Sequence, residues 1–390
     1  MSNMRNSAFF IFVFLGMLTA FGPFVTDMYL PSLPVMTRYF DTSISMVQMG
    51  LTSSMLGLAV GQLLFGPLSD RFGRREPLLW AMGIFIVSTG LCIEAPNIHV
   101  FVWLRFLQGI AASGGIVIAR SIATDKFKSR NLAKALAVVG AINGIAPIAA
   151  PIIGGSVLKA IGWKGIFGIL LVLGFVLLGF CLHFKESLSR QRRSKEKLAN
   201  SLKLFGRVLK NRKYLYYTLE LSFALAILFA YIASSPFIIQ EHYGFSPFGF
   251  SLFFAANAIA IGVGAALSVK FKSSEACLKV SCFGMAVCSL LLLFLLPWGI
   301  PVAVYEILLF ALCFMMGLSF TVATALAMDA ERTYAGTASA VMGAAGFLFG
   351  SVVSPLVGMG NILFSSGLVM VLCSMGALAA MYKVVKSGAE

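Results

Sequence analysis

The chain has 390 residues, of which 59% are hydrophobic and only 12% are charged. An ordinary soluble domain carries about 25% charged residues, so this composition indicates an integral membrane protein. The net charge of +15 would suit a nucleic-acid binder, but its distribution along the chain has a different explanation, given below. The seven cysteines are spaced neither for a metal site nor for a disulfide framework, and we expect no cofactor and no metal.

Apolar stretches of about 20 residues, long enough to cross a hydrocarbon core of about 30 Å, recur along almost the whole chain. The sequence predicts an all-α membrane protein with twelve transmembrane helices. They are expected near residues 8–30, 44–68, 78–95, 99–122, 133–157, 165–184, 214–238, 247–269, 277–297, 302–327, 335–357 and 362–382.

The basic residues follow the loops on one side of the predicted membrane. With a cytoplasmic N-terminus, all but four of the 30 Lys and Arg residues fall on or next to the cytoplasmic side. The exceptions are Arg38, Lys159 and Lys164 outside and Arg105 within a helix. This positive-inside bias predicts that both termini are cytoplasmic, and that the positive charge faces anionic inner-leaflet headgroups rather than nucleic acid.

A basic segment divides the chain into two halves. Residues 185–213 hold 11 of the 30 basic residues, and Leu198, Leu202, Phe205 and Leu209 within it recur at helical spacing. We interpret it as a cytoplasmic linker with an amphipathic helix on the inner leaflet. Six predicted helices lie before it (1–184) and six after it (214–390). "APIIGG" at 150–155 and "SPLVGM" at 354–359 repeat at an offset of 204, which favours two six-helix bundles around a central cavity.

The first predicted helix contains an acid that is costly to bury. Asp27 lies near its outer end, and a charge at the centre of a bilayer costs at least about 2.5–3.5 kcal/mol. Arg105 lies six or seven residues into the predicted fourth helix, which runs inward, so the two charges reach similar depths. Gln108 follows one turn later on the same face. The simplest interpretation is a static ion pair, and the alternative is a functional site. Glu220 is a second candidate acid, or a carboxylate that snorkels to the inner surface.

The loop between the second and third predicted helices, "GPLSDRFGRREPLL" at 66–79, is the most specific stretch. A basic cytoplasmic loop would explain Arg71 and Arg74 but not Gly66, Asp70 and Gly73 at these intervals. We interpret it as a latch of charge-assisted hydrogen bonds whose breaking lets the cytoplasmic side open. At the offset of 204, "KFKSSEACLKV" at 270–280 has lost the glycines and the Asp-Arg pair, so the second latch is predicted to be degenerate.

The pattern G-x-L-x-D-R-x-G-R-R resembles the signature loop of the major facilitator superfamily. "RFLQGIAASGG" at 105–115 looks like that family's fourth-helix motif, and "GAINGIAPIAAPIIGG" at 140–155 looks like its fifth-helix antiporter motif, except for Ala150 in place of a glycine. "GPFVTDMYLPSLP" at 22–34 and "ALAMDAERTYAGTASAVMG" at 325–343 are similar to the Bcr/CflA group of drug:proton antiporters.

This resemblance implies a set of residue roles. Asp27 would carry protons or contact cationic drug, and Arg105 would tune it, with Thr26, Gln108 and Asn143 as further cavity groups. The fifth-helix motif would pack closely against a neighbouring helix. Its residues here are Gly144, Pro151, Gly154 and Gly155.

We therefore expect proton-coupled efflux of small amphipathic compounds, such as antibiotics, across the inner membrane of a bacterium. The alternative is export of a single endogenous metabolite. The chain has no nucleophilic triad pattern and no P-loop, so neither an enzyme nor an ATP-driven pump is expected. The expected partners are a small-molecule substrate, protons and membrane lipids, and we expect a monomer.

Overall fold

The computed structural model describes residues 7–193 and 204–387, and these residues are almost entirely helical. Within them, eleven continuous helices are long and apolar enough to cross a membrane. The longest, α6 (Ser129–His183), contains a non-helical residue, Gly162, with φ 66°. The fifth and sixth predicted spans lie on either side of this glycine. The twelve predicted spans are therefore present, and two of them meet at the kink at Gly162.

The chain divides into two compact units that are interleaved in sequence. Unit 1 comprises residues 1–32 and 53–201, and unit 2 comprises residues 33–52 and 202–390. Residues 33–52 are thus grouped with unit 2, where Gln48 Nε2 donates to the carbonyl of Ala233 (2.9 Å) and Ser45 Oγ donates to that of Pro355 (3.1 Å).

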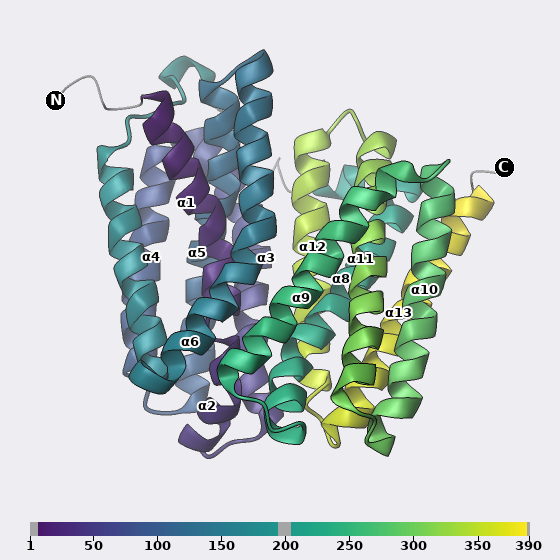
Figure 1. Cartoon of the computed structure of the whole chain (residues 1–390). Helices are drawn as coiled ribbons and strands as arrows, with labels where there is room; N and C mark the ends of the chain where they lie inside the picture. The colour runs from purple at the N-terminus through teal and green to yellow at the C-terminus, as the bar shows by residue number, and fades with distance from the viewer. Residues whose placement is uncertain (1–6, 194–203, 388–390) are drawn as a thin grey trace. The chain divides into compact units, whose positions relative to one another are not determined.

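Unit 1 contains α1, α4, α5, α6 and most of α3 (Figure 1). Within this bundle α4 packs against α5 and α6, and α1 packs against α5 and α6. The bounds are α1 Ala8–Asp27, α3 Ile44–Phe72, α4 Arg75–Ile93 and α5 Ile98–Lys126.

Unit 2 is built around α8, which packs against α11, α12 and α13, while α9 and α10 pack against α11 (Figure 1). The bounds are α2 Leu33–Tyr39, α8 Arg212–Phe237, α9 Pro247–Leu267, α10 Ser274–Leu295, α11 Val302–Ala330, α12 Ala335–Leu356 and α13 Ile362–Ser387.

Local sequence signals account for several helix ends. Asn97, Asn211 and Ser246 each precede a helix and accept a hydrogen bond from the backbone N–H three residues later. Such N-caps satisfy donors that a helix start leaves unpaired. The outward faces are apolar, as Phe283, Leu372 and Val172 illustrate, each more than 60% exposed. These faces suit lipid rather than water, so the protein is a multi-pass membrane protein.

The predicted amphipathic helix of the linker lies partly outside the described residues, because Leu198 and Leu202 fall in the gap at 194–203. Phe205 belongs to a short helix over 204–208, and Leu209 follows that helix with 41% of its surface exposed.

Candidate functional site

Asp27 is the last residue of α1 and only 7% exposed. Pro23 lies within the helix and removes one backbone donor, yet α1 continues to Asp27. The hydroxyl of Thr26 donates to the carbonyls of Gly22 (3.2 Å) and Pro23 (3.4 Å) and is thereby turned toward its own helix. The apolar interior of unit 1 therefore holds an acidic group at the C-terminal end of its first helix.

Arg105 is fully buried in α5. Its Nη1 donates to Gln108 Oε1, its Nη2 donates to the carbonyl of Val25 (3.1 Å), and its guanidinium carbon lies 4.4 Å from the ring centre of Tyr29. Gln108 is held in turn, because its Nε2 donates to Thr89 Oγ1 at 2.7 Å. A cation over an aromatic face gains electrostatic energy from the ring, about 2 kcal/mol or more when desolvated. Arg105 is thus fixed by neutral groups.

No ion pair joins Asp27 and Arg105 among the residues that the structure describes. The interpretation as a static ion pair is therefore wrong for this arrangement, since the guanidinium is committed to Gln108, Val25 and Tyr29. The positive charge still lies in the same bundle as the carboxyl. The two groups are therefore neighbours in one bundle without being locked in a salt bridge.

The structure differs from the sequence-based cavity set in two ways. Asn143 belongs to α6, but its side chain is outside the described part of the chain. Tyr29, Thr89 and Phe167, which surround Arg105 and Gln108, were not predicted. Tyr29 lies two residues after Asp27 and could have been noticed. Thr89 and Phe167 come from other helices and carry no sequence signal for this role.

The gate loop (residues 66–79) is organised by Arg74. Its guanidinium pairs with Asp125 (Nε to Oδ2, 2.9 Å) and Asp70 (Nη1 to Oδ1, 2.5 Å), and it donates to Ser69 Oγ (2.9 Å). The side chain of Asp125 is 4% exposed, whereas that of Asp70 is 56% exposed. Burial acts to lower the pKa of Arg74, but the hydrogen bonds to Asp125 and then Asp70 outweigh it. The pKa of Arg74 is therefore raised, and its charge persists at every physiological pH.

Glu186, just after α6, closes the same cluster. Its two carboxylate oxygens accept from the backbone N–H groups of Arg74 (2.9 Å) and Arg75 (3.1 Å) at the start of α4. Gly73 has φ 99°, a conformation that favours glycine, and a Cβ there would overlap the Glu186 carboxylate. The loop thus joins the ends of α3, α5 and α6 to the start of α4.

Three details of the predicted latch need correction. Gly66 lies within α3, not at a helix end, and a Cβ there would meet only Val117 in ordinary contact at 3.9 Å. Arg71 lies over the ring of Phe72 at 5.5 Å, and the guanidinium that binds Asp70 and Asp125 is that of Arg74. Asp125 and Glu186 were missed, although both lie on the predicted cytoplasmic side.

The motif predicted for the fifth span (residues 140–155) lies on α6, and its two ends differ in packing. A Cβ on Gly154 would overlap the carbonyl of Met28, next to Asp27, so this glycine permits the approach of α6 to the end of α1. Pro151 and Gly155 are buried beside it. Gly144 is exposed within its unit, and a Cβ added to it would meet no atom within 4 Å, so a close crossing at Gly144 stays a prediction.

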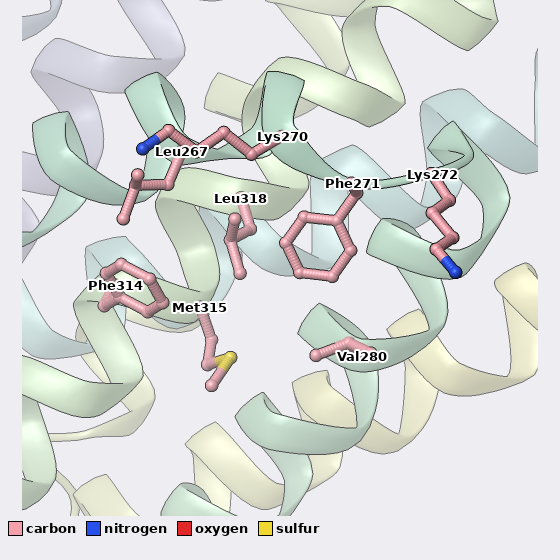
Figure 2. A pocket seen from close by; sticks show the side chains of 8 residues that line it. All are labelled: Leu267, Lys270, Phe271, Lys272, Val280, Phe314, Met315 and Leu318. Carbon is pink, nitrogen blue, oxygen red and sulfur yellow. The ribbon is translucent and has the colours of Figure 1, made fainter.

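The segment at 270–280 in unit 2, the counterpart of the gate loop, lines a hollow of about 470 Å³. Figure 2 shows Lys270 and Lys272 pointing apart on either side of Phe271, with Met315 and Val280 below them. Leu267, Phe314 and Leu318 complete the lining. This hollow contains none of the predicted cavity residues, and its walls are mostly apolar.

Comparison with known proteins gives the family. Residues 9–355 match the family profile of the Major Facilitator Superfamily. The chain is 38% identical over 350 residues to the uncharacterized MFS-type transporter YdgK of Bacillus subtilis (strain 168), covering 88% of this chain and 87% of that one. It is 29% identical over 366 residues to the bicyclomycin resistance protein homolog of Haemophilus influenzae, covering 91% and 90%.

The fold matches solved transporters. The xylose transporter XylE from E. coli aligns with a TM-score of 0.71 at 14% identity, covering 94% of this chain and 96% of that chain. The nucleoside transporter NupG aligns with a TM-score of 0.74 at 12% identity, covering 96% and 99%. At such low identity these structures support the fold alone. Taken with the family profile and the relatives, they show that the chain belongs to the Major Facilitator Superfamily and is a transporter, not an enzyme.

Proposed function

We propose that this transporter exports small amphipathic compounds, antibiotics among them, across the cytoplasmic membrane of a bacterium by alternating access, in exchange for protons. Relatives named for bicyclomycin resistance, chloramphenicol resistance and multidrug resistance support the substrate class. The observation that carries the coupling is the buried carboxyl of Asp27, which lies in the same unit as Arg105 but is not bound to it.

The proposed cycle uses the commitment of Arg105 to neutral partners. While Gln108 and Val25 hold the guanidinium, Asp27 can take up a proton from the outer side. An arriving cationic substrate favours ionised Asp27 and displaces that proton. Each proton moving inward contributes about 2.3 kcal/mol per 100 mV of membrane potential, which is enough to concentrate a substrate.

The aromatic groups near Arg105 suit an amphipathic substrate. The ring of Phe167 lies 5.8 Å from that of Tyr29 and 5.5 Å from that of Phe101, in edge contacts. Aromatic faces bind flat apolar and cationic groups without strict shape requirements. This wall would accept several drugs rather than one.

The test is a pH gradient in everted membrane vesicles, followed as drugs are added. We expect wild-type protein to dissipate the gradient with several unrelated drugs, and Asp27→Asn to reduce this response at least tenfold while retaining binding of neutral drugs. Asp41→Asn is the matched control, because Asp41 is exposed and its φ of 45° suits asparagine equally well. A gradient that responds to one metabolite and to no drug would favour the endogenous exporter.

Arg105→Ala tests the tuning role. Removing the guanidinium removes the field that favours ionised Asp27, so drug binding should change its dependence on pH, with the protonated form persisting to higher pH. Drug binding by purified protein at several pH values measures this. An unchanged pH profile would show that Arg105 serves packing only.

We propose that both termini and the 185–213 linker are cytoplasmic, as the distribution of basic residues predicts. A single cysteine at position 195 should react with an impermeant thiol reagent in everted vesicles but not in intact cells. The seven native cysteines are buried, so background labelling should be low. Labelling in intact cells would reverse the orientation.

A further inference from the structure

Unit 2 contains a buried carboxyl group of its own. Glu220 lies on α8, eight residues after its start at Arg212, or about 12 Å along the helix at 1.5 Å per residue. It is fully buried, so it does not snorkel to the inner surface. Its Oε1 accepts hydrogen bonds from Ser319 Oγ of α11 (2.6 Å) and Cys282 Sγ of α10 (3.2 Å). Glu220 therefore joins three helices.

Among the described residues, no ion pair or hydrogen bond brings a positive charge to Glu220. Cys282 is the titratable group that touches it. Nearer the start of α8, the charged groups close to Tyr217 are both acids, Glu275 of α10 and Asp329 of α11. Lys383 of α13 lies over the ring of Tyr216 at 5.8 Å. In the described part of the chain no salt bridge includes Glu220.

The second oxygen of Glu220 explains how such a group can be tolerated. Oε2 is buried and has no hydrogen-bond partner within the described structure. An uncompensated ionised carboxylate is far more costly to bury in an apolar interior than the neutral acid, because a proton on Oε2 leaves only an unpaired hydroxyl. With Oε2 buried as in this structure, the site therefore favours the protonated acid.

The two donors on Oε1 prepare the same site for the ionised state. The O···O distance of 2.6 Å to Ser319 is within the range of about 2.5–2.7 Å typical of a hydroxyl bound to a carboxylate. If water reaches Oε2, the proton can leave while Ser319 and Cys282 still stabilise the anion. A purely structural hydrogen-bond acceptor would not need a carboxylic acid, because glutamine has the same shape and one oxygen to accept both donors.

We propose that Glu220, with Ser319 and Cys282, forms a second proton-binding site, so that each unit holds one exchangeable proton. The site would release its proton when a conformational change hydrates Oε2. Its part in coupling rests on the proposed proton-driven export, but its titration does not. Asp27 and Glu220 then differ in chemistry: a guanidinium acts on the first, and only neutral donors act on the second.

Infrared difference spectroscopy of the purified full-length protein tests the site directly, by following the carboxylic C=O band as pH is raised. We expect Glu220→Gln to remove one titrating band that Asp27→Asn leaves in place. Ser319→Ala keeps the acid but removes a donor to the anion, so it should shift the same band to higher pH. If Glu220→Gln is poorly folded, this shift alone decides. A spectrum unchanged by both variants overturns the proposal.

Transport in vesicles separates this proposal from the proposed function. With a drug that wild-type protein exports, Glu220→Gln should move about half as many protons per drug molecule, since one of two sites is lost. Normal proton movement in Glu220→Gln together with its loss in Asp27→Asn would refute the second site and leave proton-coupled export intact. No proton movement in wild type would refute the coupling, while the infrared titration would still decide whether Glu220 exchanges a proton.

Discussion

Asp125 is the penultimate residue of α5 in unit 1, and Asp329, 204 residues later, is the penultimate residue of α11 in unit 2. Asp125 is buried and pairs with Arg74 of the gate loop. At the same offset from Arg74 stands Leu278, which is buried. Among the described residues, Asp329 forms its ion pair with Arg332, three residues further on, and the two side chains are 61% and 80% exposed. Unit 2 thus has leucine at the position of Arg74, and the ion-pair cluster that Arg74 forms in unit 1 has no counterpart among the described residues there.

Unlike the charge cluster, the close helix crossings made by glycine are present in both units. In unit 1, a Cβ on Gly57 of α3 would overlap the carbonyl of Phe106, and one on Gly109 of α5 would overlap that of Ser54. In unit 2, Gly264 of α9 and Gly317 of α11 meet the carbonyls of Phe314 and Ile261 in the same way. Small residues let helix backbones approach closely in membranes. Close packing is thus common to both units, and the charge cluster belongs to one.

The largest effect is expected at these crossings. Gly109→Val and Gly317→Val place a branched side chain against a backbone carbonyl that cannot move away cheaply, so both should lose most folded protein. Gly83→Val on α4 is the control, since nothing lies within 4 Å of a Cβ there. Size-exclusion profiles and thermal unfolding in detergent measure the outcome. Tolerance of only one crossing variant would show that the two units differ in packing as well.

The next effect separates the two aspartates. Asp125→Asn leaves Arg74 with a poorer partner at a buried site, and breaking such a pair costs up to about 3–5 kcal/mol. Asp329 and Arg332 are both exposed, so water screens their pair and it contributes little. We therefore expect at least a tenfold loss of transport for Asp125→Asn, with drug binding within a few-fold of wild type, and less than a twofold change for Asp329→Asn. Equal effects of the two variants would show that the buried Asp125 pair is no more important for transport than the exposed Asp329 pair.

The charge on Arg74 also predicts how the stabilising effect of its ion pairs depends on pH. Its pKa is raised in the folded protein, so its pairing contributes fully below the ordinary arginine range and is lost only as pH rises above that range. The stability difference between wild type and Arg74→Ala, measured by thermal unfolding, should therefore be constant across physiological pH as far as Arg74 is concerned. A difference that falls between neutral and mildly alkaline pH would contradict a charged Arg74.

A smaller effect is expected from Asp70→Asn. Asp70 belongs to the same cluster but is half-exposed, and water can replace part of its bond to Arg74. Transport should fall, with drug binding retained, but less than in Asp125→Asn. Transport rates of both variants at equal expression measure the ranking. A larger loss in Asp70→Asn would mean that Asp70 finds another partner during the transport cycle.

The smallest effect is expected in the hollow of unit 2. Lys270 and Lys272 point apart on either side of Phe271 (Figure 2), and such lysines contribute surface charge toward lipid headgroups rather than a latch. The double variant Lys270→Ala/Lys272→Ala should transport within twofold of wild type. A tenfold loss would show that the degenerate loop retains a gating role.

Sequence alone was sufficient for the class of fold, because a run of about 20 apolar residues has few structural alternatives in a membrane. It also singled out Asp27, Arg105 and the gate loop, since charges and glycines stand out against an apolar background. The kink at Gly162 shows its limit, as hydropathy separates two spans but does not say how sharply the backbone turns between them.

Tertiary structure alone decided the partners of each charge. Arg105 faces Gln108 and Tyr29 instead of Asp27, and Arg74 pairs with Asp125 from a distant helix. Helical spacing predicts which residues share a face, but hydrogen bonds between helices depend on crossing depth and rotation, which local periodicity does not encode. Glu220 illustrates this most clearly: its place near an inner helix end suggested contact with water, and only the packing of α10 and α11 against α8 buries it.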